Sequence, residues 1–259
     1  MDAPIIAAVG KLEKPEVLSV ADRQARIDLA AAFRLAVRMD LHEGVCNHFT
    51  LMLPDGKRFL LNPYGLHWSE VSASNLLALD ADGRILEGEG EAENTAFYIH
   101  SRIHLANPKA ACVLHTHMPY ATALTLTEPG RLEMVEQNAL RFADDIAYDN
   151  SYNGRVVDDA EGDRLARVLG AKRVLFLANH GVIVVGPTVA EAYDLLYYLE
   201  RACRLQVLAR ATGLPFRKVR PEVVRETCRM ILADTPKYAG AHFAALKRIL
   251  DREDPGYAR

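Results

Sequence analysis

The amino-acid sequence predicts an α/β protein in which helices pack on a mixed, mainly antiparallel sheet. Two pairs of short apolar runs, 49–53 with 58–61 and 76–79 with 84–86, are each separated by turn residues, which is typical of hairpins. Segments with helical spacing of apolar residues lie before, between and after these runs. Hairpins early in the chain, with helices interleaved, favour a single domain built around one sheet.

Each element of the first half has a start or stop signal in the sequence. Residues 1–18 are expected to form an irregular arm, after which Ser19 and Asp22 open a helix. Ser72 is expected to cap a short helical turn between the hairpins. A second helix ends at an Asn-Pro pair, which helices seldom cross. The helices and the buried strand expected here are Val20–Leu41, Asn94–Leu105 and Ala111–Thr116.

The second half opens with a less regular region, residues 127–153. Thr188 and Glu191 form a capping box, which marks the start of a long helix that ends near Ala211. Two C-terminal helices are expected after it. The remaining elements are a helix, Asp159–Leu169, and two β-branched apolar strands, Val174–Ala178 and Val182–Val185. We therefore expect the domain to span residues 19–215, with residues 216–259 packed on it as helices.

Composition excludes several classes of protein. The chain has 259 residues, of which half are hydrophobic and a quarter charged, and its net charge of −3 gives no basic surface for nucleic acid. No apolar run reaches the roughly 18 residues of a membrane span, and the N-terminus lacks the pattern of a signal peptide. The four scattered cysteines are typical of reduced thiols. We expect a cytoplasmic protein that binds neither nucleic acid nor membrane.

Two histidines interrupt an apolar strand in the segment VLHTHMPY, residues 113–120. Side chains alternate along a strand, so His115 and His117 share one face about 7 Å apart, and both can reach one metal ion. A hydrogen-bonded structural pair would give the same pattern. A third histidine, His180 in LANHGVIVV, lies at a break between two apolar strands, where a side chain can face a cleft. Together the three imidazoles predict a divalent-metal site.

Several segments together resemble the class II aldolase and adducin family over residues 20–215. They are EGVCNHFTLMLP with FLLNPYGLHWSEV, IHSRIHLANPKAACVLHTHMPYATAL, and FLANHGVIVVGPTVAEAYDLLYYLERACRLQ. The resemblance implies a three-layer α/β/α sandwich around a mainly antiparallel mixed sheet. It also implies a divalent ion, usually zinc, held by His115, His117 and His180, with iron, manganese and cobalt as alternatives. Members usually form a four-fold tetramer with sites at subunit interfaces, so we expect a homotetramer.

The resemblance further implies lyase chemistry on a small molecule. Three neutral imidazoles leave the ion its full charge and an open position, which suits the polarisation of a carbonyl or the stabilisation of an enolate oxygen. The same stabilisation serves C–C cleavage by an aldolase and decarboxylation of an oxo or hydroxy acid. Two alternatives remain: an iron(II) oxygenase with three histidine ligands, and an adducin-like interaction module without catalysis.

The sequence departs from the sugar-phosphate aldolases at two sets of positions. Those enzymes carry a glutamate, both metal ligand and acid/base, nineteen residues before the first metal histidine, and this position is Ala96 here. The paired serines that help to hold a phosphate correspond to Asn94 and Thr95, and the usual arginine falls on Met52. We therefore expect a non-phosphorylated hydroxy or oxo acid, bound through hydrogen bonds donated by His48 and its neighbours and cleaved through an enolate stabilised by the ion.

Further candidates follow from their positions in the family. Tyr148 and Tyr152 lie in a segment that approaches a neighbour's site in relatives, and a tyrosine hydroxyl can donate a proton. His100 lies one helical turn after Ala96 on the same face and is the third catalytic candidate. Ordinary loop tyrosines and a buried histidine are the alternatives for these residues. The substrate-binding candidates are Asn47, His48, Gly65, Asn94 and Thr95.

Overall fold

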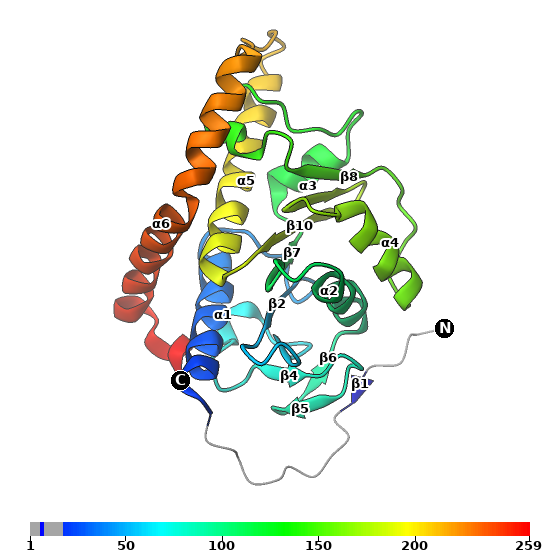
Figure 1. Cartoon of the computed structure of the whole chain (residues 1–259), viewed down its shortest axis with the longest axis vertical. Helices are drawn as coiled ribbons and strands as arrows, with labels where there is room; N and C mark the ends of the chain where they lie inside the picture. Colours follow the sequence, from blue (N-terminus) through cyan, green and yellow to red (C-terminus); the bar gives the residue numbers. More distant parts are fainter. Residues whose placement is uncertain (1–5, 8–17) are drawn as a thin grey trace.

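The computed structural model, which describes residues 6–7 and 18–259, has a central eight-stranded sheet (Figure 1). The strand order is β5-β4-β3-β2-β7-β10-β9-β8, and all neighbours are antiparallel except β8 and β9. The strands are β2 (His48–Met52), β3 (Phe59–Leu61), β4 (Leu77–Leu79), β5 (Ile85–Glu87), β7 (Cys112–Thr116), β8 (Ile146–Asp149), β9 (Val174–Leu177) and β10 (Gly181–Gly186). A separate pair joins β1 (Ile6–Ala7) to β6 (Glu91–Ala92). The predicted mainly antiparallel mixed sheet is confirmed.

Helices cover both faces of this sheet, which confirms the predicted three-layer sandwich. Figure 1 shows α1, α5 and α6 on one side and α2 and α4 on the other. Helix α6 packs along α5, and α2 packs closely on α4. The helices are α1 (Val20–Arg38), α2 (Asn94–Ala106), α3 (Pro119–Thr125), α4 (Asp159–Leu169), α5 (Val189–Arg210) and α6 (Pro221–Glu253), with 3-10 turns η1 (Trp68–Glu70), η2 (Ala139–Phe142) and η3 (Pro255–Ala258).

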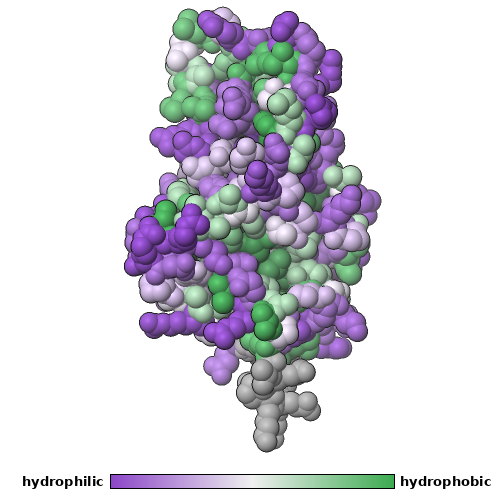
Figure 2. Space-filling model, turned by 60° about the vertical axis from the view of Figure 1, so that its left-hand side comes forward, coloured by the Kyte–Doolittle hydropathy of each residue, from purple (hydrophilic) through white to green (hydrophobic). Residues whose placement is uncertain are grey.

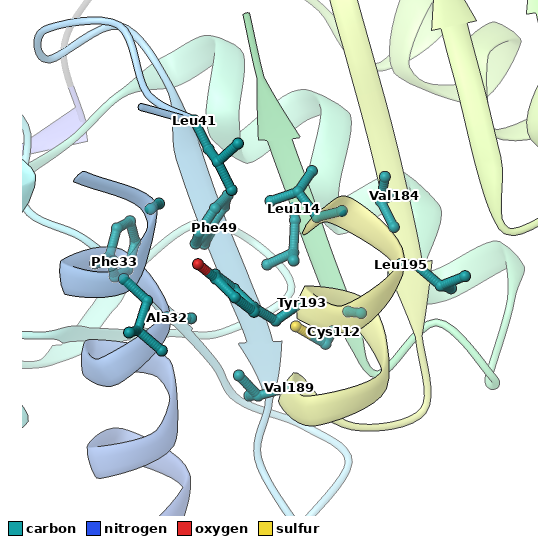
Figure 3. Close-up of a cluster of buried hydrophobic side chains, with 14 of the residues drawn as sticks. Ala32, Phe33, Leu41, Phe49, Cys112, Leu114, Val184, Val189, Tyr193 and Leu195 are labelled. Carbon is teal, nitrogen blue, oxygen red and sulfur yellow. The ribbon is translucent and has the colours of Figure 1, made fainter. Parts of the chain in front are cut away.

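The central strands bury both of their faces, each in a different core. Leu114 of β7 packs with Phe33 of α1, Phe49 of β2 and Tyr193 of α5 in the larger core (Figure 3). Val113, its neighbour, packs in a second core formed with residues of α2 and α4. Because side chains alternate along a strand, the histidines of the HxH motif belong to the face that α2 and α4 cover.

Side-chain caps begin three helices at the predicted places. The Ser19 hydroxyl accepts a hydrogen bond from the Asp22 N–H at 3.0 Å, and Thr188 accepts one from the Glu191 N–H at 3.2 Å. Asp158 caps α4 in the same way. Each cap satisfies an N–H group that has no partner within its helix. These polar signals therefore define where α1, α4 and α5 start.

One expectation for the second half of the chain is wrong. One helix, α6, of 33 residues replaces the two expected C-terminal helices, although Pro236 lies inside it. Pro236 lies at an exposed position, so water can bind the carbonyl that loses its partner, and buried residues from Cys228 to Leu250 hold the helix against the core. The region 127–153 contains η2 and β8. The expected arm, residues 1–18, lies largely outside the described residues.

The surface around α5 and α6 carries apolar side chains where these helices meet solvent. Figure 2 shows apolar patches among hydrophilic residues at the upper end of this face, where α5 ends and α6 begins. The exposed apolar residues of this region are Leu205, Leu208, Leu214, Met230, Leu232 and Tyr238.

Among the described residues, no helix combines the length and the apolar character that crossing a membrane requires.

Candidate metal centre

Three histidines converge at the end of the two central strands β7 and β10. His115 lies in β7, His117 follows its last residue, and His180 precedes the first residue of β10. The strands are antiparallel, with Val182 opposite Thr116, so the end of β7 lies beside the start of β10. One nitrogen from each imidazole lies within 4.8 Å of the other two. The predicted metal-ligand set is therefore brought together by strand pairing.

The Asn-His-Gly turn is shaped for this convergence. Asn179 adopts a left-handed backbone conformation with φ of 57°, which asparagine tolerates better than most residues. Gly181 lies so close to β7 that a Cβ atom would be 2.5 Å from the Thr116 carbonyl oxygen and 2.8 Å from Cδ2 of His117. Any side chain at Gly181 would therefore displace His117 or the strand that carries it.

Hydrogen bonds orient two of the rings. Nδ1 of His115 lies 3.0 Å from the Val182 carbonyl oxygen. A carbonyl oxygen can only accept a hydrogen bond, so Nδ1 carries the ring proton and Nε2 has a lone pair for a metal ion. Nδ1 of His117 lies 2.5 Å from a carboxylate oxygen of Glu43. Nε2 of His117 is buried and has no hydrogen-bond partner. Metal-binding histidines usually donate their other ring nitrogen to a carbonyl or a carboxylate, so the three residues fit a divalent ion.

Burial keeps two of the three histidines, His115 and His180, in the neutral form that binds metal. Burial, with a smaller contribution from the neighbouring His117, lowers the pKa of His180 to about 4. Burial, with smaller contributions from neighbouring histidines, holds the pKa of His115 well below its ordinary value. A neutral imidazole has the lone pair that a metal needs. His115 and His180 can therefore bind a cation at neutral pH without first losing a proton.

The three histidines form the floor of a pocket that also contains several other predicted residues. His48, Thr95 and Tyr152 line it, and the Tyr152 ring lies 6.5 Å from that of His180, centroid to centroid. Burial lowers the pKa of His48 to about 3, with smaller contributions from His117 and His180. The complete lining is Val45, Cys46, His48, Tyr64, Glu93, Thr95, His115, His117, Tyr152, Gly154, Arg155, Val156 and His180.

Other candidates lie outside this lining. The Tyr148 hydroxyl accepts a hydrogen bond from the Leu132 N–H at 3.2 Å, and the residue lines a different cavity of its own chain. His100 is fully buried behind His48, so in this chain it has no direct access to a substrate. Gly65 supplies a turn with φ of 84° next to Tyr64, which does line the pocket. These residues support the site in the described chain without forming its wall.

The two candidate asparagines are also buried beside the pocket. The side-chain oxygen of Asn47 accepts a hydrogen bond from the Glu43 N–H at 2.8 Å, so Asn47 fixes the loop that carries Glu43. Its Nδ2 is buried without a hydrogen-bond partner, as is Oδ1 of Asn94. Buried polar atoms are nearly always paired. Asn47 and Asn94 therefore contribute unused hydrogen-bonding capacity next to the site.

No carboxylate can come from the position where the aldolases have their glutamate. Ala96 is fully buried in an apolar cluster that includes Phe59 and Phe97. The acid that lines the pocket is Glu93, one turn earlier. One of its oxygens accepts a hydrogen bond from the Ala96 N–H at 2.7 Å, and the other lies 3.3 Å from Arg155. Glu93 therefore caps helix α2 and also contributes to the pocket wall.

Sequence reasoning did not identify two charged residues at this site. Glu43 orients His117, and Arg155 is the cationic residue of the lining, three-quarters exposed as a side chain. Both come from irregular segments that approach the histidines through the fold. Arg155 follows an Asn-Gly pair and Glu43 precedes a glycine, which indicates turns but says nothing of chemistry. No local pattern separates either residue from other surface charges.

Comparison with known proteins gives the family directly. The family profile described as the Class II Aldolase and Adducin N-terminal domain matches residues 27–207. A Caulobacter vibrioides protein named for class 2 aldolases is 34% identical over 93% of this chain and 94% of its own. The adducin-related protein C1289.14 of Schizosaccharomyces pombe is also 34% identical, over 94% of this chain and 84% of its own.

Solved structures agree with this assignment. The structure of an aldolase II superfamily protein from Pseudomonas syringae superposes with a TM-score of 0.87 at 32% identity, covering 93% of this chain and 98% of that one. The fold, the three convergent histidines and the matched residues 27–207 all lead to one conclusion. This chain belongs to the class II aldolase and adducin family.

Proposed function

We propose that the chain is a divalent-metal-dependent lyase that cleaves a C–C bond in a small, non-phosphorylated hydroxy or oxo acid. The observation that carries the proposal is the convergence of three imidazoles, with an unpaired buried nitrogen on His117, in the lining of a pocket. A chain without catalysis has no need of such a set. Membership of a family that contains aldolases supports this reaction class.

The metal, zinc in this proposal, is held by His115, His117 and His180. When bound, a divalent ion supplies a positive charge that stabilises the negative charge left on the substrate as a C–C bond breaks. Burial lowers the pKa of His115 and His180, and the Val182 carbonyl and Glu43 fix the orientation of the His115 and His117 rings. These contacts predefine the ligand positions before metal arrives, which strengthens binding.

Arg155 is the group that we expect to bind the acid function of the substrate. It lines the pocket, and its side chain is largely exposed, so it can move toward a ligand. A guanidinium matches a carboxylate through two parallel hydrogen bonds. A phosphate ester carries nearly twice the charge and needs more converging donors, whereas Arg155 is the one arginine or lysine in the described lining. The pocket therefore favours a carboxylate.

Tyr152 is the proposed proton donor. Its ring lies over the pocket beside His180, and more than half of its surface is exposed. Its hydroxyl can protonate the carbanion that remains after bond cleavage. In an aldol-type cleavage, which releases an aldehyde, the carboxylate stays bound at Arg155, whereas in a decarboxylation it leaves as carbon dioxide. Tyr148, by contrast, has its hydroxyl occupied by the Leu132 N–H. We therefore assign the proton transfer to Tyr152 rather than to Tyr148 or His100.

The test combines metal analysis with a substrate screen. The zinc-loaded protein is incubated with 2-hydroxy, 2-oxo and hydroxybenzoic acids, and with sugar phosphates, while carbon dioxide and aldehydes are measured. We expect turnover of an acid, and a loss of about 10²–10⁴-fold in kcat for Tyr152→Phe, the usual range for a general acid. Tyr238→Phe, an exposed tyrosine on α6, is the matched control and should leave kcat unchanged. Turnover of sugar phosphates alone would contradict the proposal.

A second function is favoured by one specific finding. Among the relatives, the adducin-related protein of fission yeast is as similar to this chain as the class 2 aldolase relative, at 34% identity. The chain would then be an adducin-like interaction module. The two functions are distinguished by His117→Ala, because this substitution should abolish turnover of a lyase but leave protein binding by an interaction module intact.

A further inference from the structure

A continuous chain of hydrogen bonds runs from the pocket wall into the core. Nδ1 of His48 lies 2.8 Å from Nε2 of His100, and Nδ1 of His100 lies 2.7 Å from the Thr50 hydroxyl. The same hydroxyl lies 2.8 Å from Nε2 of His104, and Nδ1 of His104 lies 2.7 Å from the Ala110 carbonyl oxygen. All four side chains are buried. We call these four residues, His48, His100, Thr50 and His104, the histidine chain.

At the inner end of the histidine chain, the direction of each hydrogen bond, from donor to acceptor, is fixed. The Ala110 carbonyl oxygen can only accept a hydrogen bond, so Nδ1 of His104 must carry a proton. A neutral imidazole has one proton, so Nε2 of His104 must accept from Thr50. Thr50 has one hydroxyl hydrogen, and this bond uses it. Its oxygen must therefore accept the remaining bond, which is donated by Nδ1 of His100.

The same logic continues to the pocket. Because His100 is protonated at Nδ1, its Nε2 has a lone pair and accepts from His48. His48 must therefore carry its proton on Nδ1. Its other nitrogen, Nε2, is left without a proton, and His48 lines the pocket next to the metal-ligand histidines, 4.9 Å from the ring of His115. One backbone carbonyl, Ala110, thus determines the tautomer of a side chain four hydrogen bonds away.

We propose that the histidine chain makes His48 a pure hydrogen-bond acceptor in the pocket, so that the substrate group it contacts is an O–H donor. This changes the expectation from sequence, in which His48 donates a hydrogen bond to a carboxylate. An acceptor nitrogen would instead repel a carboxylate oxygen. The hydroxyl of a hydroxy acid is the group that fits, with the carboxylate directed to Arg155. The identity of this substrate group rests on the proposed function, whereas the tautomer does not.

Two other roles for His48 are less compatible with the structure. An imidazolium would place a positive charge beside a site arranged to hold a cation. A fourth metal ligand would need Nε2 close to all three ligand nitrogens, but the set of nitrogens within 4.8 Å of one another comprises His115, His117 and His180. Thr50, His100 and His104 then act as positioning residues, because they reach the pocket only through His48.

The first experiment measures the tautomers directly in metal-free protein. With ¹⁵N-labelled histidine, ring nitrogen shifts distinguish protonated from bare nitrogens, and His48→Gln, His100→Gln and His104→Gln spectra assign the resonances. We expect all three histidines to be protonated on Nδ1. Thr50→Val, which removes the hydroxyl, should change the shifts of His48 and His100, and Thr50→Ser should restore them. A proton on Nε2 of His48 in the wild-type protein, or unchanged shifts in Thr50→Val, would overturn the proposal.

The second experiment tests the acceptor with zinc-loaded protein and two matched probes. Glycolate offers an O–H donor, and methoxyacetate has the same carboxylate but no donor. We expect glycolate to bind about threefold to tenfold more tightly by calorimetry, the usual contribution of one hydrogen bond. The preference should disappear in Thr50→Val and return in Thr50→Ser. Tighter binding of methoxyacetate would overturn the inference.

Measuring zinc affinity shows whether His48 is a hydrogen-bond acceptor or a metal ligand. Measuring enzyme activity tests the proposed function separately from this inference. His48→Gln should lower zinc affinity by no more than about 100-fold, as for residues outside the ligand set. A loss as large as that of His117→Ala would make His48 a ligand and overturn the inference. If the tautomers and the glycolate preference are as expected but no acid is turned over, the proposed function fails and the acceptor role of His48 stands.

Discussion

The protein should lose stability in mild acid because it buries neutral histidines. His104 is the clearest case: it is buried, it bonds the Ala110 carbonyl at 2.7 Å, and it lies outside the metal-ligand set. Burial lowers its pKa from 6.5 to about 4, although the bond to Ala110 opposes this shift. The unfolded chain therefore takes up a proton as pH falls through 6.5, while the folded protein does not until pH 4.

The size of this effect follows from the shift in the pKa of His104. Its contribution is fully present above pH 6.5 and is lost as pH falls toward 4. One titrating group changes the free energy of unfolding by about 1.4 kcal/mol per pH unit in this window. Over the whole interval the loss from His104 alone is about 3 kcal/mol, a large part of the roughly 5–15 kcal/mol that stabilises a typical domain.

The assay is urea unfolding of metal-free protein between pH 7.5 and 4 at one protein concentration, since metal and assembly also change apparent stability. The slope of unfolding free energy against pH should be smaller for His104→Gln than for the wild type, by up to about 1.4 kcal/mol per unit. Ile103→Val is the matched control: it removes one buried methyl group from the same helix, so its cost of about 1 kcal/mol should not vary with pH. Equal slopes for His104→Gln and wild type would refute the reasoning.

Three further predictions concern the site and the assembly. His117→Ala should remove most bound zinc, measured by elemental analysis after dialysis, and full occupancy would contradict the ligand set. Gly181→Ala should lower zinc affinity and thermal stability, because its Cβ would lie 2.5 Å from the Thr116 carbonyl oxygen; an unchanged protein would show that β7 adjusts freely. Light scattering should give about 115 kDa, four chains of 28.7 kDa, and a stable monomer with full activity would contradict a homotetramer.

Much of the fold could be predicted because its signals are local. Caps at Ser19, Asp158 and Thr188 mark helix starts, and alternating apolar residues mark the central strands. Strand β8 has no such signal. Its four residues, Ile146–Asp149, lie at the edge of the sheet, three of them partly exposed, and they end in a charged residue. Pairing with β9 makes them a strand, and this pairing cannot be read from four residues.

In the site too, features with a local sequence signal could be predicted, and features that depend on tertiary contacts could not. The three ligand histidines could be predicted because the HxH and Asn-His-Gly patterns are each contained in a few residues. Glu43 and Arg155 could not, because each reaches the pocket through an irregular loop. The polarity of the histidine chain also depends on tertiary contacts: the antiparallel register sets His48 opposite His115, and only the packing of α2 brings His100 within 2.8 Å of His48.

Ala96 and two members of the histidine chain lie on the same face of helix α2. Ala96, His100 and His104 lie at successive turns of this helix, and all three are buried against the sheet. Where the aldolases carry a glutamate, this stripe begins with an apolar residue packed beside Phe97. The two histidines that follow it meet Thr50 and His48 of β2. This face of helix α2 therefore supplies no acid to the pocket, and it fixes which nitrogen of His48 carries no proton. A lyase of this kind would take its proton from Tyr152 and contact a substrate hydroxyl through His48, while Arg155, the one arginine or lysine of the described lining, favours a carboxylate over a phosphate ester.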